Sequence, residues 1–295
     1  MPLAQTGDLV TEAAQVSGAV AAFNVVTLEH IEAVIAGAEA ARAPVILQIS
    51  ENAVKFRYGR LIPLARAATT AAHLAQVPVA LHLDHVSGDE LLRQAADAGF
   101  SSVMYDASRL PYAQNLAATR AAVAWGHANG LWVEAELGQV GGKHEEAPLD
   151  AHAPGARTRP LEALGFVRDS GVDALAVAIG SSHAMTTRAA ALDHALLARL
   201  AATLDVPLVL HGSSGVPDAE LAAAVRGGIA KVNVGTALNV AMTAAIRTYL
   251  TANPHAVDSR RYLSVGREAM ARTVTELILT VRGAGVPAEV PVPAA

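Results

Sequence analysis

Short apolar runs of strand length recur eight times along the chain, and this repetition limits the possible folds more than any other feature. The runs occupy residues 21–26, 44–50, 77–85, 102–108, 131–138, 173–180, 206–212 and 230–236. Stretches with helical periodicity lie between them, at 29–42, 59–75, 89–98, 112–128, 193–204, 218–226 and 237–250. Because nearly all residues of the runs are apolar, we expect strands that are buried on both faces, as in a parallel sheet.

Eight strands that alternate with helices fit the arithmetic of a (β/α)8 TIM barrel, an α/β fold of about 250 residues. An open, doubly wound sheet is the rival architecture, but it usually carries a glycine-rich phosphate turn after its first strand, and residues 23–26 have none. We therefore predict a single barrel domain over residues 1–283, with a short helix before the first strand and an extra C-terminal helix at 259–282. Residues 284–295 are predicted to be a flexible tail.

Composition excludes several classes of function. The chain has no cysteine, so disulfides, thiolate nucleophiles and cysteine-based zinc sites are ruled out. A net charge of -5 argues against a nucleic-acid partner. Although the mean hydropathy is +0.33, the apolar runs are far shorter than the ~18 residues of a membrane helix. Residues 1–18 lack both a basic segment and a long apolar block, so we expect no signal peptide, no membrane contact and a cytoplasmic location.

Polar residues stand at the carboxyl ends of all eight predicted strands, the end at which a TIM barrel performs chemistry. They are Asn24, Ser50, Asp84, His85, Asp106, Glu136, His183, His211 and Asn233. Turns favour Gly, Asn, Asp and Ser over His. A single histidine at such a position is commonly structural, but three imidazoles around one mouth are typical of a catalytic metal site. Being neutral, they leave the full charge of a divalent ion for a substrate.

The other histidines give weaker signals. Strand alternation points His82 the same way as Asp84, which favours a hydrogen bond inside the barrel. We expect five histidines on helices or at their ends to lie at the surface: His30, His73, His127, His194 and His255. His144 and His152 fall in the long loop 139–159, which is either an active-site lid or a solvated insertion, and its place on the catalytic face favours the lid.

The loops after the seventh and eighth predicted strands suit a phosphate group. They contain HGSSG at 211–215 and NVGT at 233–236, and each is followed by a helix. In TIM barrels these two loops frequently bind phosphate through backbone N–H groups and a helix N-terminus. Ordinary N-capping by serine and threonine is the alternative explanation.

Taken together, these motifs resemble one family. They are FNV at 23–25, LHLDH at 81–85, VEAELG at 133–138 with Gly141 and Gly142, AIGSSH at 178–183, LHGSSG at 210–215 and KVNVGT at 231–236. In this order they resemble the class II, metal-dependent ketose-bisphosphate aldolases over about residues 5–280. No single motif carries the resemblance, which is specific as a set.

The resemblance implies a role for each matching residue. His85, His183 and His211 would bind a catalytic zinc ion, and Asp84 would be the acid/base on the hydroxyl at the cleaved bond. Asp106 and Glu136 would match a second site for a divalent or monovalent cation. Residues expected to contact the substrate and its dihydroxyacetone phosphate end are Asn24, Ser50, Gly212, Ser213, Ser214, Asn233, Val234, Gly235 and Thr236. The resemblance also implies a homodimer or homotetramer and a sugar phosphate substrate.

The chemistry of an aldolase suits these residues independently. Retro-aldol cleavage needs a base for one hydroxyl and an electron sink for the resulting enediolate, and a three-histidine metal site is such a sink. A lysine Schiff base is the competing solution, but the chain has only Lys55, Lys143 and Lys231. The first two are expected in loops. Lys231, on the eighth strand, is more consistent with supporting the phosphate loop or pairing with a barrel carboxylate.

Some positions depart from the family pattern. Ala184 follows the sixth-strand histidine where many members have glycine. The residue that exchanges the carbon-bound proton is expected just after Gly142, where Glu145 is favoured over Glu146 and His144. Gly235 replaces a polar residue of some fructose-specific members. Arg157 or Arg267 could receive a distal phosphate or lie at the surface.

These observations predict an aldolase that cleaves a ketose 1,6-bisphosphate, by default fructose 1,6-bisphosphate, to dihydroxyacetone phosphate and an aldehyde. Tagatose bisphosphate or another ketose 1-phosphate is the alternative substrate. More remote hypotheses are a TIM-barrel metal hydrolase, which commonly has His-x-His on its first strand, and a non-catalytic sugar-phosphate sensor, which would not need Asp84.

Overall fold

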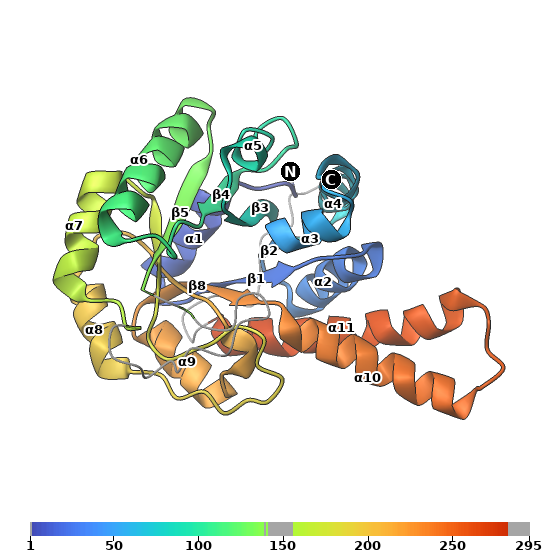
Figure 1. Cartoon of the computed structure of the whole chain (residues 1–295). Helices are drawn as coiled ribbons and strands as arrows, with labels where there is room; N and C mark the ends of the chain where they lie inside the picture. Colours follow the sequence, from blue (N-terminus) through green and yellow to red (C-terminus); the bar gives the residue numbers. More distant parts are fainter. Residues whose placement is uncertain (1, 139, 141–155, 283–295) are drawn as a thin grey trace.

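The computed structural model describes residues 2–138, 140 and 156–282, and its centre is a closed barrel of eight parallel strands (Figure 1). The strands follow one another around the barrel in chain order, and β8 pairs with β1 to close it. Their bounds are β1 Val20–Asn24, β2 Val45–Ser50, β3 Val79–Val86, β4 Ser102–Tyr105, β5 Trp132–Leu137, β6 Ala174–Val177, β7 Leu208–Leu210 and β8 Ile229–Val234. The predicted TIM barrel is confirmed.

Helices cover the outside of the barrel (Figure 1). Their bounds are α1 Thr6–Gln15, α2 Leu28–Ala41, α3 Glu51–Phe56, α4 Ile62–Leu74, α5 Asp89–Leu92, α6 Tyr112–Ala128, α7 Pro160–Ser170, α8 His194–Thr203, α9 Asp218–Arg226, α10 Thr236–Ala252 and α11 Ser259–Val281, with a short 3-10 turn η1 at Ser213–Gly215. The extra C-terminal helix, α11, packs against α2 and α10. Much of α10 and the start of α11 project from the barrel as an arm (Figure 1).

The sequence prediction differs from the structure in three ways. The helix expected at 89–98 ends at Leu92, because i to i−3 bonds, such as that from the Gln94 N–H to the Leu91 carbonyl (3.1 Å), tighten the next residues into turns. Helices α3 and α7 were not predicted. The strands expected at 102–108, 173–180 and 206–212 end earlier, at Tyr105, Val177 and Leu210, so the polar residues after them lie in loops.

The barrel interior has an apolar floor and a polar layer above it. Leu9 and Val10 of α1 pack against small interior residues and close the barrel at the amino ends of the strands. Above them the interior holds Gln48, His82, Glu134 and Lys231, all fully buried. Because buried polar groups are costly without partners, most polar atoms of this layer are hydrogen-bonded, but Gln48 Oε1 and His82 Nε2 have no hydrogen-bond partner among the described residues.

Three further predictions concern the surroundings of two histidines and the C-terminal tail. His82 does hydrogen-bond in the barrel, through Nδ1 to the Ser102 hydroxyl at 2.8 Å. His30 was expected at the surface, which is wrong: it is 3% exposed, because α2 packs it against Asn239 of α10 (3.2 Å). The tail predicted at 284–295 lies outside the described residues. No helix in the described ranges is long and apolar enough to span a membrane.

Candidate metal and substrate site

Three histidines from distant parts of the chain meet at the carboxyl ends of the strands. His85 lies near the end of β3, His183 lies in the loop after β6, and His211 directly follows β7. One nitrogen from each ring lies within 4.8 Å of the other two. The ring centres are 4.9 Å apart for His85 and His211 and 5.1 Å apart for His85 and His183. In the described part of the chain, this is the group of side chains that could hold a metal ion.

The local backbone explains how these rings converge. His85 has a left-handed φ of +52°, where the register between β3 and β4 shifts. A register shift changes the direction of a side chain, and a strained backbone conformation persists only where the surrounding structure enforces it. Gly212, directly after His211, has φ +66°, and a Cβ there would lie 2.6 Å from the Ser182 carbonyl. The loops that carry His183 and His211 therefore touch at a point where only glycine fits.

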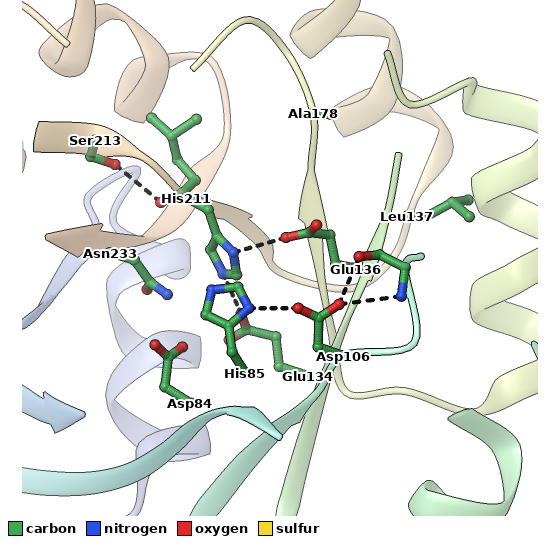
Figure 2. A network of polar contacts seen from close by, with 12 residues as sticks. Asp84, His85, Asp106, Glu134, Glu136, Leu137, Ala178, His211, Ser213 and Asn233 are labelled. Atoms are coloured by element: carbon green, nitrogen blue, oxygen red, sulfur yellow. Dashed lines mark hydrogen bonds and ion pairs between the residues drawn. The ribbon is translucent and has the colours of Figure 1, made fainter. Parts of the chain in front are cut away.

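Carboxylates hold two of these histidines (Figure 2). Asp106 Oδ2 lies 2.8 Å from Nδ1 of His85. His211 is bonded at both nitrogens, to Glu136 at 3.0 Å and to Glu134 at 2.9 Å. Burial opposes a charge on His211, but these two carboxylates outweigh it and raise the pKa of His211 to about 9. One carboxylate must release a nitrogen, and a proton must leave, before His211 can bind an ion.

The donor set fits a divalent transition metal. Three imidazoles that leave a fourth position open are the ligands of several catalytic zinc sites, and carboxylates that bind their second nitrogen fix the ring orientation. Asp106 and Glu136 were predicted for a second cation site. In this structure they contact the histidines and are not members of the three-residue group.

Asp84 lies next to the histidines, and one of its carboxylate oxygens has no hydrogen-bond partner among the described residues. It is 2% exposed, and its Oδ2 accepts a hydrogen bond from the Asn24 amide at 2.8 Å. Gln48 in turn donates to Asn24 Oδ1 at 3.2 Å, which fixes that amide. Among the described residues nothing donates to Asp84 Oδ1. Burial disfavours the charge, yet the attraction of His85 lowers the pKa of Asp84 to about 2, so the carboxylate is ionised near neutral pH.

A cavity of about 530 Å³ opens over these groups. The predicted site residues that line it are Asn24, Ser50, Asp84, His85, Asp106, His183, Gly212, Ser214, Asn233, Gly235 and Thr236. His211 and Glu136 are not among its lining residues and are almost completely buried. Most of the site residues predicted from the sequence therefore lie at one cavity.

The side chains of two residues predicted to contact the substrate do not point into this cavity. The Val234 side chain belongs to the buried core, so only its backbone could meet a ligand. The Ser213 hydroxyl donates to the Leu210 carbonyl at 3.1 Å, and its side chain lines a separate cavity. Ser214 accepts from the Ala237 N–H at 3.0 Å at the start of α10, which supports the capping interpretation for this hydroxyl. Glu145, His144 and His152 lie outside the described residues.

Several lining residues were missed by the sequence analysis. Lys55, expected in a loop, lies on α3 and pairs with Glu51 at 2.6 Å. The i, i+4 spacing of this pair directly after Ser50 was a usable signal for a helix at the cavity. Further missed lining residues are Val26, Asn52, Ser87, Arg109, Ala184 and Asn239. Arg157 lines a different cavity, and Arg267 pairs with Glu32 away from the site.

The fold and the site together define a TIM-barrel enzyme with a candidate three-histidine metal centre and an adjacent ionised carboxylate. Comparison with known proteins then gives the family. The family model described as "Fructose-bisphosphate aldolase class-II" matches residues 4–285. The chain belongs to this family and is an aldolase, a carbon–carbon lyase.

Individual relatives agree with this assignment. The chain is 35% identical over 276 residues to a fructose-bisphosphate aldolase of Staphylococcus aureus strain Mu50, an alignment that covers 93% of this chain and 95% of that one. It is 31% identical to the crystal structure of the YdjI aldolase from Escherichia coli K12, with a TM-score of 0.81 over 97% of this chain and all of that one (100%). A fructose-bisphosphate aldolase structure from Campylobacter jejuni, at 23% identity, shares the fold with a TM-score of 0.80 over 95% of each chain.

Proposed function

We propose that this aldolase reversibly cleaves a ketose 1,6-bisphosphate to dihydroxyacetone phosphate and an aldehyde, with fructose 1,6-bisphosphate as the first candidate. The observation that carries the proposal is the carboxylate of Asp84 next to the cluster of His85, His183 and His211, at a cavity of about 530 Å³. These histidines would hold Zn²⁺, which supplies a Lewis acid that draws electron density from the substrate carbonyl. A Schiff base on Lys231 is disfavoured, because its Nζ is already hydrogen-bonded to Glu134 and Asn233.

We assign the proton transfer of the reaction to Asp84. As a carboxylate, it accepts the proton of the hydroxyl on the carbon that becomes the aldehyde, and it returns this proton in the condensation direction. Asn24 holds this carboxylate through Oδ2, and Oδ1 has no hydrogen-bond partner among the described residues. A base with a pKa of about 2 is weak, so the role requires that the hydroxyl be acidified by the bound metal or that substrate raise this pKa.

The other lining groups suit a phosphorylated end and a carbonyl end. Gly212 and Gly235 line the cavity beside the N-terminus of α10, which Thr236 begins, and glycines at a helix N-terminus are suited to binding phosphate. The Ser50 hydroxyl accepts from the Ala53 N–H at 3.2 Å, so its own proton remains available to a substrate oxygen. Glu145 is proposed to exchange the carbon-bound proton, and a second cation near Asp106 and Glu136 stays a prediction.

A second substrate has one specific observation in its favour. At Gly235 a side chain would approach Asn24 Oδ1 to 3.0 Å, and its absence leaves room in the cavity where some fructose-specific members carry a polar group. Tagatose 1,6-bisphosphate or another ketose 1-phosphate is therefore the alternative. We also propose a homodimer or homotetramer, supported by the projecting arm of α10 and α11, which exposes Val240, Leu250 and Val257 (Figure 1). The cytoplasmic location stays a prediction.

The proposal is tested by measuring kcat/KM for a panel of phosphorylated ketoses, since discrimination between substrates lies in that ratio. We expect release of dihydroxyacetone phosphate together with a free aldehyde, and the highest ratio for a 1,6-bisphosphate. Release of inorganic phosphate without carbon–carbon cleavage would instead indicate a hydrolase. Borohydride added with substrate should leave activity intact, whereas covalent trapping on Lys231 would restore the Schiff-base hypothesis.

A further inference from the structure

Beneath the cavity, one ammonium group joins two elements of the site. Lys231 on β8 is fully buried, and its Nζ lies 2.8 Å from Glu134 Oε2 and 2.8 Å from Asn233 Oδ1. Glu134 uses its other oxygen to bind His211 Nε2 at 2.9 Å. A chain of contacts therefore runs from a candidate metal ligand, through a carboxylate and an ammonium, to an amide at the cavity (Figure 2 shows its two ends, His211 and Asn233).

The ammonium determines which end of the amide faces the cavity. An ammonium group has three donors and no acceptor, so it can bind only the carbonyl oxygen of Asn233. The NH2 group of Asn233 must then point the other way. Asn233 lines the cavity, is 5% exposed, and its Nδ2 donates to no described residue. A buried donor without a partner is costly, so this NH2 group is available to an acceptor in the cavity, either water or a substrate oxygen.

Stability alone does not explain the ion pair. Burying a charge costs several kcal/mol per ion even after relaxation, and apolar residues of similar size often replace buried pairs without loss. What distinguishes this pair from apolar side chains of the same size is its directional contacts to His211 and Asn233.

We propose that Lys231 is a positioning residue: it fixes the Asn233 carboxamide so that the NH2 group donates to an acceptor oxygen of the phosphorylated ketose, and it fixes Glu134 against His211. This inference rests on the proposed function for the identity of the ligand. The orientation of the amide does not depend on that identity, because it follows from the 2.8 Å contact with Nζ.

The absence of cysteine from the chain allows a sharp test. In Lys231→Cys, the new thiol is the only one, and it can be alkylated in denaturant before refolding. Bromoethylamine gives S-aminoethylcysteine, which restores the ammonium with sulfur in place of one methylene. Propyl iodide gives a neutral side chain of the same length, and wild-type protein taken through the same treatment is the refolding control. Circular dichroism and thermal unfolding establish that each form is folded.

We expect the propyl form to raise KM for the phosphorylated ketose by about 10-fold or more, as for loss of a well-placed hydrogen bond, with a smaller change in kcat. The aminoethyl form should return KM to within about threefold of the refolded wild type. Asn233→Asp, which keeps an acceptor for Lys231 but turns an oxygen toward the cavity, should raise KM at least as much as the propyl form. Equal KM values for folded propyl and aminoethyl forms would overturn the inference.

A second readout separates this inference from the proposed function. The side-chain amide of Asn233 gives a nitrogen–proton NMR signal that is identified by its loss in Asn233→Asp. We expect this signal to move in the propyl form and to return in the aminoethyl form, with no substrate present. If the refolded wild type cleaves no ketose in the panel, the proposed function fails, and the amide signal still decides the positioning role. An amide signal that is the same in both forms contradicts it.

Discussion

Replacing Gly212 with alanine tests whether the contact between the loops carrying His183 and His211 sets the geometry of the site. The substitution places a methyl in a left-handed conformation, which costs ~1–2 kcal/mol for a side chain, partly offset by ~0.4–1 kcal/mol from a less flexible unfolded chain. The new Cβ would also lie 2.6 Å from the Ser182 carbonyl and must move by about 0.8 Å to reach an ordinary 3.4 Å contact. Overpacking of this kind adds ~1–3 kcal/mol, so we expect a total loss of roughly 2–4 kcal/mol.

Gly59→Ala is the matched control, because Gly59 also has a left-handed φ of +72° but no atom within 4 Å of the added Cβ. It should lose only ~1 kcal/mol, so the difference between the two variants isolates the steric contact. Urea unfolding gives both free energies. The same displacement moves the loop that begins at Gly212, and a shift of ~1 Å in positioning groups can lower the rate ~100-fold, so kcat/KM should fall in Gly212→Ala alone. If Gly212→Ala is as stable and as active as Gly59→Ala, the reasoning is wrong.

Three further predictions concern Asp84, the metal and His82. Asp84→Ala should lower kcat by ~10²–10⁴-fold, as for loss of an acid/base, while calorimetry still detects binding of dihydroxyacetone phosphate; a sensor would have no turnover to lose. EDTA should abolish cleavage, and added zinc or cobalt should restore it, whereas turnover that resists the chelator contradicts the metal assignment. Burial, followed by the charge of Lys231, lowers the pKa of His82 from 6.5 to about 3, so stability should fall as the pH drops from 6.5 toward 4.5, because only the unfolded chain gains this proton. Over that pH range, the free energy of unfolding should fall by ~2–3 kcal/mol less in His82→Gln than in the wild type, as measured by urea titrations.

The sequence was sufficient to predict the barrel, and it named most of the polar residues that the structure gathers at one cavity. Periodicity locates strands because each one is buried on both faces, and α6 and α9 have the predicted bounds, 112–128 and 218–226. The short helix α3 was missed because six residues are too few for a helical period to show. Its Glu51 and Lys55 therefore did not enter the predicted site, although Glu51 directly follows Ser50 and Lys55 lies one helical turn later.

The sequence by itself determined which chemical groups this protein can use: no thiol, few lysines, and histidines with carboxylates at the ends of strands that a closed barrel brings to one mouth. Tertiary structure alone decided how these groups are oriented. The partners of His211 and the hydrogen bond that holds Asp84 depend on contacts between residues 60 to 97 positions apart, such as Asn24 with Asp84 and Glu134 with Lys231. Lys231 binds Asn233 only two positions away, but its ammonium is itself held by Glu134 from a distant strand. Hydrogen bonds require angles and distances of a few ångströms, and periodicity along the chain carries no information at that scale.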